Sequence, residues 1–155
     1  MSIAQVKQAA ANIVQQIPNV GTVDLKRLDA DSLPRRIATQ PAGKPYWAVT
    51  VGRAQSRIAA FGTTDCAVWR DYRVRVEGWL GFVGVDDKQD EWEQITQLML
   101  DHFDRRRAQA AQSISGFYDW TPAIEMIDIV ELRNGTRAHH VLIEVPTRAF
   151  ERVVT

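Results

Sequence analysis

The residues of this chain best suited to chemistry are two adjacent histidines, His139 and His140, with Asp128 a short distance before them. Imidazole and carboxylate groups are common metal ligands and proton-transfer groups. Adjacent residues of a strand point to opposite faces, however, so the two histidines cannot easily share one ion. His102 lies on a predicted helix, apart from both. We therefore predict no metal site.

The other reactive groups are isolated in the sequence. The single cysteine, Cys66, allows neither an intrachain disulfide nor a cysteine-based zinc site. Asp86, Asp87 and Asp90 could bind a divalent cation, but capping of a helix explains them equally well. The chain has no Gly-x-Ser-x-Gly motif and no glycine-rich phosphate loop. We expect no catalytic residues and no cofactor, and predict that the protein is not an enzyme.

Composition indicates one globular domain spanning residues 1–155. The chain is 45% hydrophobic, and its 19 basic residues balance 19 acidic ones. A net charge of zero argues against binding nucleic acid mainly through phosphate contacts, which needs a basic excess. The N-terminus has no signal-peptide pattern, and no apolar stretch approaches the ~20 residues that a membrane span needs. We expect a protein made and folded in the cytoplasm, with no membrane partner.

The strongest structural signal is a predicted strand over residues 69–82, whose two faces differ. One face is apolar and predicts a core-facing surface, formed by Tyr72, Val74, Val76, Leu80 and Phe82. The other face is charged and aromatic, formed by Arg73, Arg75, Glu77 and Trp79. Solvent exposure explains the charges but explains Trp79 poorly. A subunit or partner interface explains all four residues, because Arg and Trp are favoured interface anchors. Both interpretations remain open.

The elements around this strand have recognisable patterns. Helices are predicted over residues 2–17 and after Gly84, each with an apolar stripe. Further strands are predicted over residues 20–28, 46–51 and 58–61, with an irregular proline-containing connection at 29–45, a polar loop at 52–57 and an aromatic segment at 116–122.

Asn134-Gly135 predicts a C-terminal β-hairpin, because this dipeptide favours a two-residue type I′ turn. That turn would place Leu132 opposite Arg137, and Glu125 opposite Glu144. The second pair carries like charges, so either both side chains are solvated or the pairing slips there. Pro146 is expected to end the hairpin, leaving residues 147–155 as a loose tail or a docking arm.

Together these elements predict an α+β fold. We expect a mainly antiparallel β-sheet with two amphipathic helices packed on one face and the C-terminal hairpin at its end.

Basic residues cluster at Arg35-Arg36, at Arg53 with Arg57, and at residues 105–107. A solvated or salt-bridged surface is one explanation. Alternatively, several copies in a ring would concentrate one cluster around a central channel, so that a neutral chain would form a basic lining. The loop predicted to carry Arg53 and Arg57 is the preferred candidate for that lining.

The order of these elements resembles the tail terminator (tail completion) proteins of long-tailed bacteriophages. The matching features are the amphipathic first helix, the strand Tyr46–Val51 and the long alternating strand from Tyr72. An acidic helix start at Asp86–Trp92 and a closing strand at His140–Val145 follow. The similarity covers most of the chain in element order. The connection at 29–45 and the aromatic segment depart from it.

This resemblance implies a structural virion protein of a phage tail or neck. Such proteins assemble as a hexameric ring on the head-proximal end of the tail tube, end its polymerisation and dock to the head connector. Their partners would be sister subunits, the tail tube protein and a head connector or neck protein, with DNA passing through without sequence-specific binding. The alternatives are a head-completion protein of the same region, or a cytoplasmic α+β binding module or dimeric enzyme that takes a small ligand between the sheet and the second helix.

Overall fold

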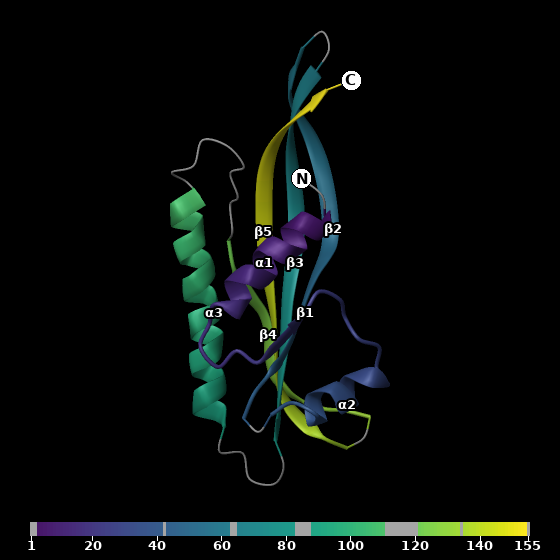
Figure 1. The fold of residues 1–155 in the computed structure, drawn as a ribbon, viewed down its shortest axis with the longest axis vertical. Helices are drawn as coiled ribbons and strands as arrows, with labels where there is room; N and C mark the ends of the chain where they lie inside the picture. Colours follow the sequence, from purple (N-terminus) through teal and green to yellow (C-terminus); the bar gives the residue numbers. More distant parts are fainter. Residues whose placement is uncertain are drawn as a thin grey trace.

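A five-stranded, mainly antiparallel sheet forms the centre of the molecule (Figure 1). The computed structural model describes residues 3–41, 43–62, 65–82, 88–110, 121–133 and 135–154. The sheet order is β1-β2-β3-β5-β4, with β1 parallel to β2 and the other neighbours antiparallel. The predicted α+β class is confirmed. The elements are α1 (Ile3–Gln15), β1 (Thr22–Asp24), α2 (Ser32–Ala38), β2 (Tyr46–Phe61), β3 (Asp65–Phe82), α3 (Gln89–Ala110), β4 (Ala123–Glu131) and β5 (Arg137–Val154).

Helices lie on both faces of the sheet. α1 and α3 pack on the face that carries Trp47, Val74 and Val76, and together they enclose the main apolar core. α2 packs on the opposite face, where Leu33 and Ile37 cover a smaller cluster. The two predicted helices thus share one face, as expected. α2 is an addition within the connection that we expected to be irregular, because its prolines and short length hide a helical period.

A tightly packed pair fixes β2 against β3 in the main core. The ring of Trp47 lies directly over Gly78, so that a Cβ at this position would collide with it. Trp47 also stacks on Trp92 of α3, with ring centroids 5.4 Å apart, and its Nε1 donates to the carbonyl of Val20 at 2.8 Å. Gly78 is therefore required for the close approach of helix, tryptophan and strand.

Three strands continue past the helices as a projecting arm, at the top of Figure 1. β2 pairs with β3 from Tyr46↔Trp79 to Phe61↔Cys66, and β5 pairs with β3 to Asp65↔Val154. Residues 52–57 belong to this arm, so the prediction of a polar loop there is wrong. Residues 52–58 of β2 are all exposed, so this stretch lacks the apolar alternation by which strands are recognised.

β5 runs through Pro146, so the prediction that the hairpin ends there is wrong. The carbonyl of Pro146 accepts a hydrogen bond from the amide of Thr121 at 3.2 Å. The carbonyl of Pro146 therefore faces away from β3. It faces the side on which β4 pairs with β5 only as far as Glu144. A proline nitrogen on that side removes no bond from the β3–β5 ladder. Residues 147–154 are accordingly a strand of the arm rather than a loose tail.

The C-terminal hairpin forms, but one residue out of the predicted register. Glu131 rather than Leu132 lies opposite Arg137. The amide of Leu132 donates to the carbonyl of Thr136, and Gly135 has φ of 80°, which is typical of a longer loop with a left-handed glycine. A bulge between Ile124 and Met126 then places Ala123 opposite Glu144, so the like-charge pair does not form.

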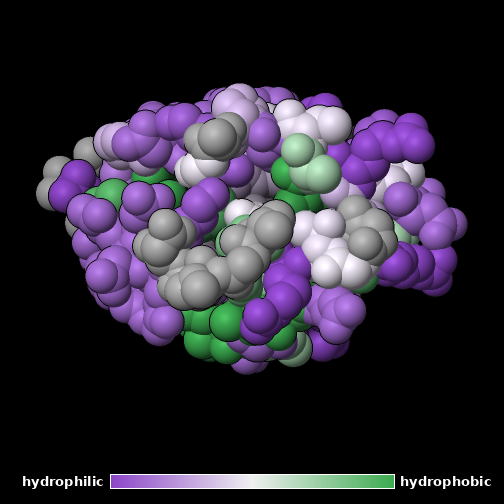
Figure 2. All heavy atoms as spheres, turned by 90° about the horizontal axis from the view of Figure 1, so that it is seen from below, coloured by the Kyte–Doolittle hydropathy of each residue, from purple (hydrophilic) through white to green (hydrophobic). Residues whose placement is uncertain are grey.

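The end of the molecule opposite the arm is largely hydrophilic, with a hydrophobic group of atoms gathered along one margin (Figure 2). The predicted cap residues Asp86 and Asp87, and most of the aromatic segment at 116–122, lie outside the described residues.

Candidate assembly surfaces

The charged face of β3 divides into a buried half and a less buried half. Trp79 is only 3% exposed and stacks between Tyr46, at 5.9 Å, and His140, at 5.4 Å. Glu77 is also buried. The chain itself therefore covers both residues, and the tryptophan that favoured an interface on sequence grounds has an intramolecular explanation. This is a correction to the predicted interface for Trp79 and Glu77.

His140 joins three strands through two carboxylates. Its Nε2 lies 2.8 Å from Glu77 Oε2 on β3, and its Nδ1 lies 2.9 Å from Asp128 Oδ1 on β4. Burial opposes protonation, but the hydrogen bonds and charges of Glu77 and Asp128 outweigh it and raise the pKa of His140 above 6.5. Arg27 approaches Glu77 at 3.5 Å and adds a compensating charge. The cluster is a structural clamp that holds the edge strand.

The less buried half of the face consists of Arg73 and Arg75. Arg73 is exposed and lies 3.7 Å from Glu144 on β5. Arg75 is half-buried, and its Nε has no hydrogen-bond partner within the described part of the chain. Of the four predicted interface residues, these two are the ones whose position suits contact with a partner.

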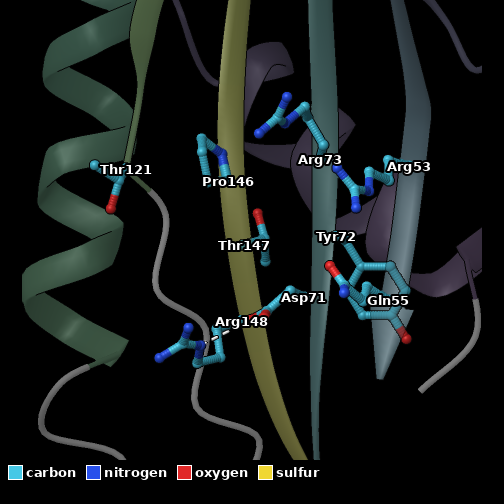
Figure 3. Close-up of a pocket in the computed structure, with 9 residues that line it drawn as sticks. All are labelled: Arg53, Gln55, Asp71, Tyr72, Arg73, Thr121, Pro146, Thr147 and Arg148. Atoms are coloured by element: carbon cyan, nitrogen blue, oxygen red, sulfur yellow. Dashed lines mark hydrogen bonds and ion pairs between the residues drawn. The ribbon is translucent and has the colours of Figure 1, made fainter. Parts of the chain in front are cut away.

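A hollow of ≈350 Å³ lies beside Arg73 on the same face of the arm (Figure 3). Arg53 stands next to Arg73 because the two residues are register partners, and Arg148 closes the β5 side. Arg148 donates through Nε to Asp71 Oδ1 at 2.8 Å. The hollow is lined by Arg53, Gln55, Asp71, Tyr72, Arg73, Thr121, Pro146, Thr147 and Arg148.

The charges around the hollow favour an anionic partner. Arg57 pairs with Asp71 at 3.0 Å, so both predicted channel residues, Arg53 and Arg57, lie on one face of the arm. Burial raises the pKa of Asp71, but Arg148 and Arg57 outweigh it and hold this pKa below its usual value. Arg53 itself has no ion pair among the described residues. Four arginines thus share this face with two carboxylates, Asp71 and Glu144, which leaves a local excess of basic charge on a neutral chain.

β4 presents a second unusual surface. It is the last strand at its edge of the described sheet, and eight of its nine residues are exposed. Four large apolar side chains there are between 40% and 51% exposed: Ile124, Met126, Ile127 and Ile129. An exposed apolar edge strand is a template for pairing with another chain. The Asn134-Gly135 turn predicted the hairpin that contains this strand, but it could not show whether another layer covers the strand.

The two adjacent histidines lie on opposite faces of β5. His139 points to the helix-covered face and packs against Phe82 and Trp92, opposite to His140. Across the described ranges, no group of three or more histidine, cysteine or carboxylate residues is placed to hold a metal ion. Cys66 is half-buried at the start of β3. None of the helices described is both long and apolar enough to cross a bilayer.

Comparison with known proteins adds no relative. No protein-family model matches the chain, and no curated protein matches it. The class of protein therefore rests on the fold and its surfaces: an α+β domain with a projecting arm, a basic hollow and an apolar free edge.

Proposed function

We propose that this chain is a structural virion protein that forms a ring at the head-proximal end of a phage tail, ends tube polymerisation and joins tail to head. The exposed apolar edge of β4 carries the proposal. A stable monomer normally covers an edge with this much exposed apolar surface, whereas a subunit of an assembly leaves it open for a neighbour. The order of elements adds support, because it resembles that of tail terminators.

The arm and its arginines fit the same role. A three-stranded projection with a basic face can line a channel or contact the tube, while α1, α3 and the main core lie on the opposite face of the sheet. α2 lies on the same face as the arginines, nearer the end away from the arm (Figure 1). Arg53 and Arg57 lie on that face, and DNA crossing a ring would meet them as unspecific positive charge. The remaining partners on this proposal are the tail tube protein and a head connector or neck protein. A head-completion protein of the same region would use the same surfaces.

The arginine-lined hollow favours one other class, a module that binds a small anionic ligand. Oligomeric state separates the two. Negative-stain microscopy and sedimentation of the purified protein, alone and with the cognate tail tube, should reveal a six-fold ring. A monomer or dimer under both conditions would contradict the ring proposal. Saturable binding of phosphate or a dicarboxylate by that monomer would support the ligand module.

A further inference from the structure

We propose that neighbouring copies associate head to tail, with β4 of one copy pairing antiparallel with the free length of β2 of the next. This inference rests on the proposed ring and identifies the two surfaces that would form it. The β4 edge is described above. It contains no lysine or proline, and its three carboxylates would oppose a second β4 but suit a strand that carries basic residues.

The complementary edge lies on the opposite side of the sheet. β1 covers β2 only at Tyr46–Ala48, because its three residues pair there and no further. Within the described ranges, the next part of β2 has no neighbouring strand on that side, and all of its residues from 52 to 58 are exposed. This stretch also has no proline, so its backbone groups are available for a ladder.

Charge favours these two edges over other combinations. β4 carries Glu125, Asp128 and Glu131 with no basic residue, whereas β2 carries Arg53 and Arg57 with no acidic residue. Two β4 strands facing each other would oppose three acidic residues with three more. The part of β5 that extends past β4, from Pro146 onward, is a less suitable partner for β2, because it contains Pro146 and the basic Arg148.

Strand direction is compatible with this pairing. β2 is antiparallel to β3, β3 to β5, and β5 to β4, so β4 and β2 run in opposite directions within one copy. In a ring whose strands are tilted against its axis, neighbours keep that direction and the new pair is antiparallel. The free part of β2 lies nearer the arm than β4 does, so the pairing shifts the strand register between neighbours, and the tilt of the strands accommodates this shift. Staggered strands are what a closed sheet requires.

Such pairing leaves the sheet faces free. Side chains stand perpendicular to a sheet, so the arginines of β2 would still face the channel while its backbone bonds to the neighbour. A contact between two different edges is heterologous and continues from copy to copy until it closes.

Cysteine cross-linking tests the pairing. Ile127 lies on the helix-covered face of the sheet, as Ala54 and Ser56 do. Ile127→Cys would be combined with Ala54→Cys or Ser56→Cys in a Cys66→Ser background and oxidised in the presence of tail tubes. We expect disulfide-linked dimers and a ladder of higher multimers. Gln97→Cys on α3, paired with Ile127→Cys, is the control and should give no ladder.

The outcomes separate this inference from the proposed function. Rings that form by microscopy without any β4–β2 cross-link would overturn the pairing and leave the ring proposal intact. Dimers that stop at two copies, linked through Ile127→Cys alone, would indicate β4–β4 contact and also overturn it. Absence of both rings and cross-links would contradict both proposals.

Discussion

His140 lies between two carboxylates, and its charge therefore links β3, β4 and β5. When protonated, both ring nitrogens donate, to Glu77 and to Asp128. When neutral, one nitrogen has no proton to offer, and a carboxylate oxygen faces a lone pair. The cation is thus the form that the fold stabilises.

Stability should consequently fall as pH rises. The pKa of His140 is raised above its unfolded value of 6.5, so the stabilisation is complete below pH 6.5 and disappears as pH passes the folded pKa. Urea unfolding across pH 6 to 9 should show a falling midpoint in the wild type and a flatter one in His140→Gln. His102→Gln, on α3 and outside this cluster, serves as control, and its urea midpoint should fall with pH as the wild-type midpoint does. An unchanged slope in His140→Gln would contradict the clamp.

Gly78 permits the packing of Trp47, and a methyl group there should be poorly tolerated. Gly78→Ala is expected to lower the free energy of unfolding by about 1–3 kcal/mol, the usual range for overpacking a core. Gly52→Ala is the matched control on the exposed arm, where the nearest atom to a new Cβ is the flexible Arg75 Cδ at 3.0 Å. Its effect should stay within about 0.5 kcal/mol. Equal effects in urea unfolding would argue against the close Trp47 contact.

Among the elements, those with one buried face were predictable from sequence. α1 shows the apolar period of a helix, and the C-terminal part of β3 shows that of a strand. Both elements form at the predicted residues. The β2 part of the arm was not predictable, because residues 52–57 are exposed and show no apolar alternation. α2 was missed because seven residues with an internal proline give too short a period.

The candidate site shows the same limit. The two faces of β3 followed from alternation, but whether α2 covers Trp79 depends on a contact between distant segments. Sequence placed Arg53 and Arg57 together, yet their neighbours Arg73 and Arg148 come from other strands and meet them only through pairing. The exposure of β4 likewise depends on the position of α3 and not on the strand itself.

At the scale of the whole molecule, the described sheet has two free edges that differ in charge and in apolar surface. A basic arm projects from one end, an acidic apolar edge lies on one side, and an unpaired length of β2 lies on the other. These features have little use in an isolated globular protein. They become complementary when several copies surround an axis, which connects the fold to the proposed assembly.

The most direct test of the proposed function is the growth of tail tubes. Cognate tail-tube protein would be allowed to polymerise with and without this protein, and tube lengths would be measured by electron microscopy. We predict that the protein caps one end of each tube as a ring and stops its elongation. Tubes that elongate equally with and without the protein, and carry nothing at their ends, would contradict the account.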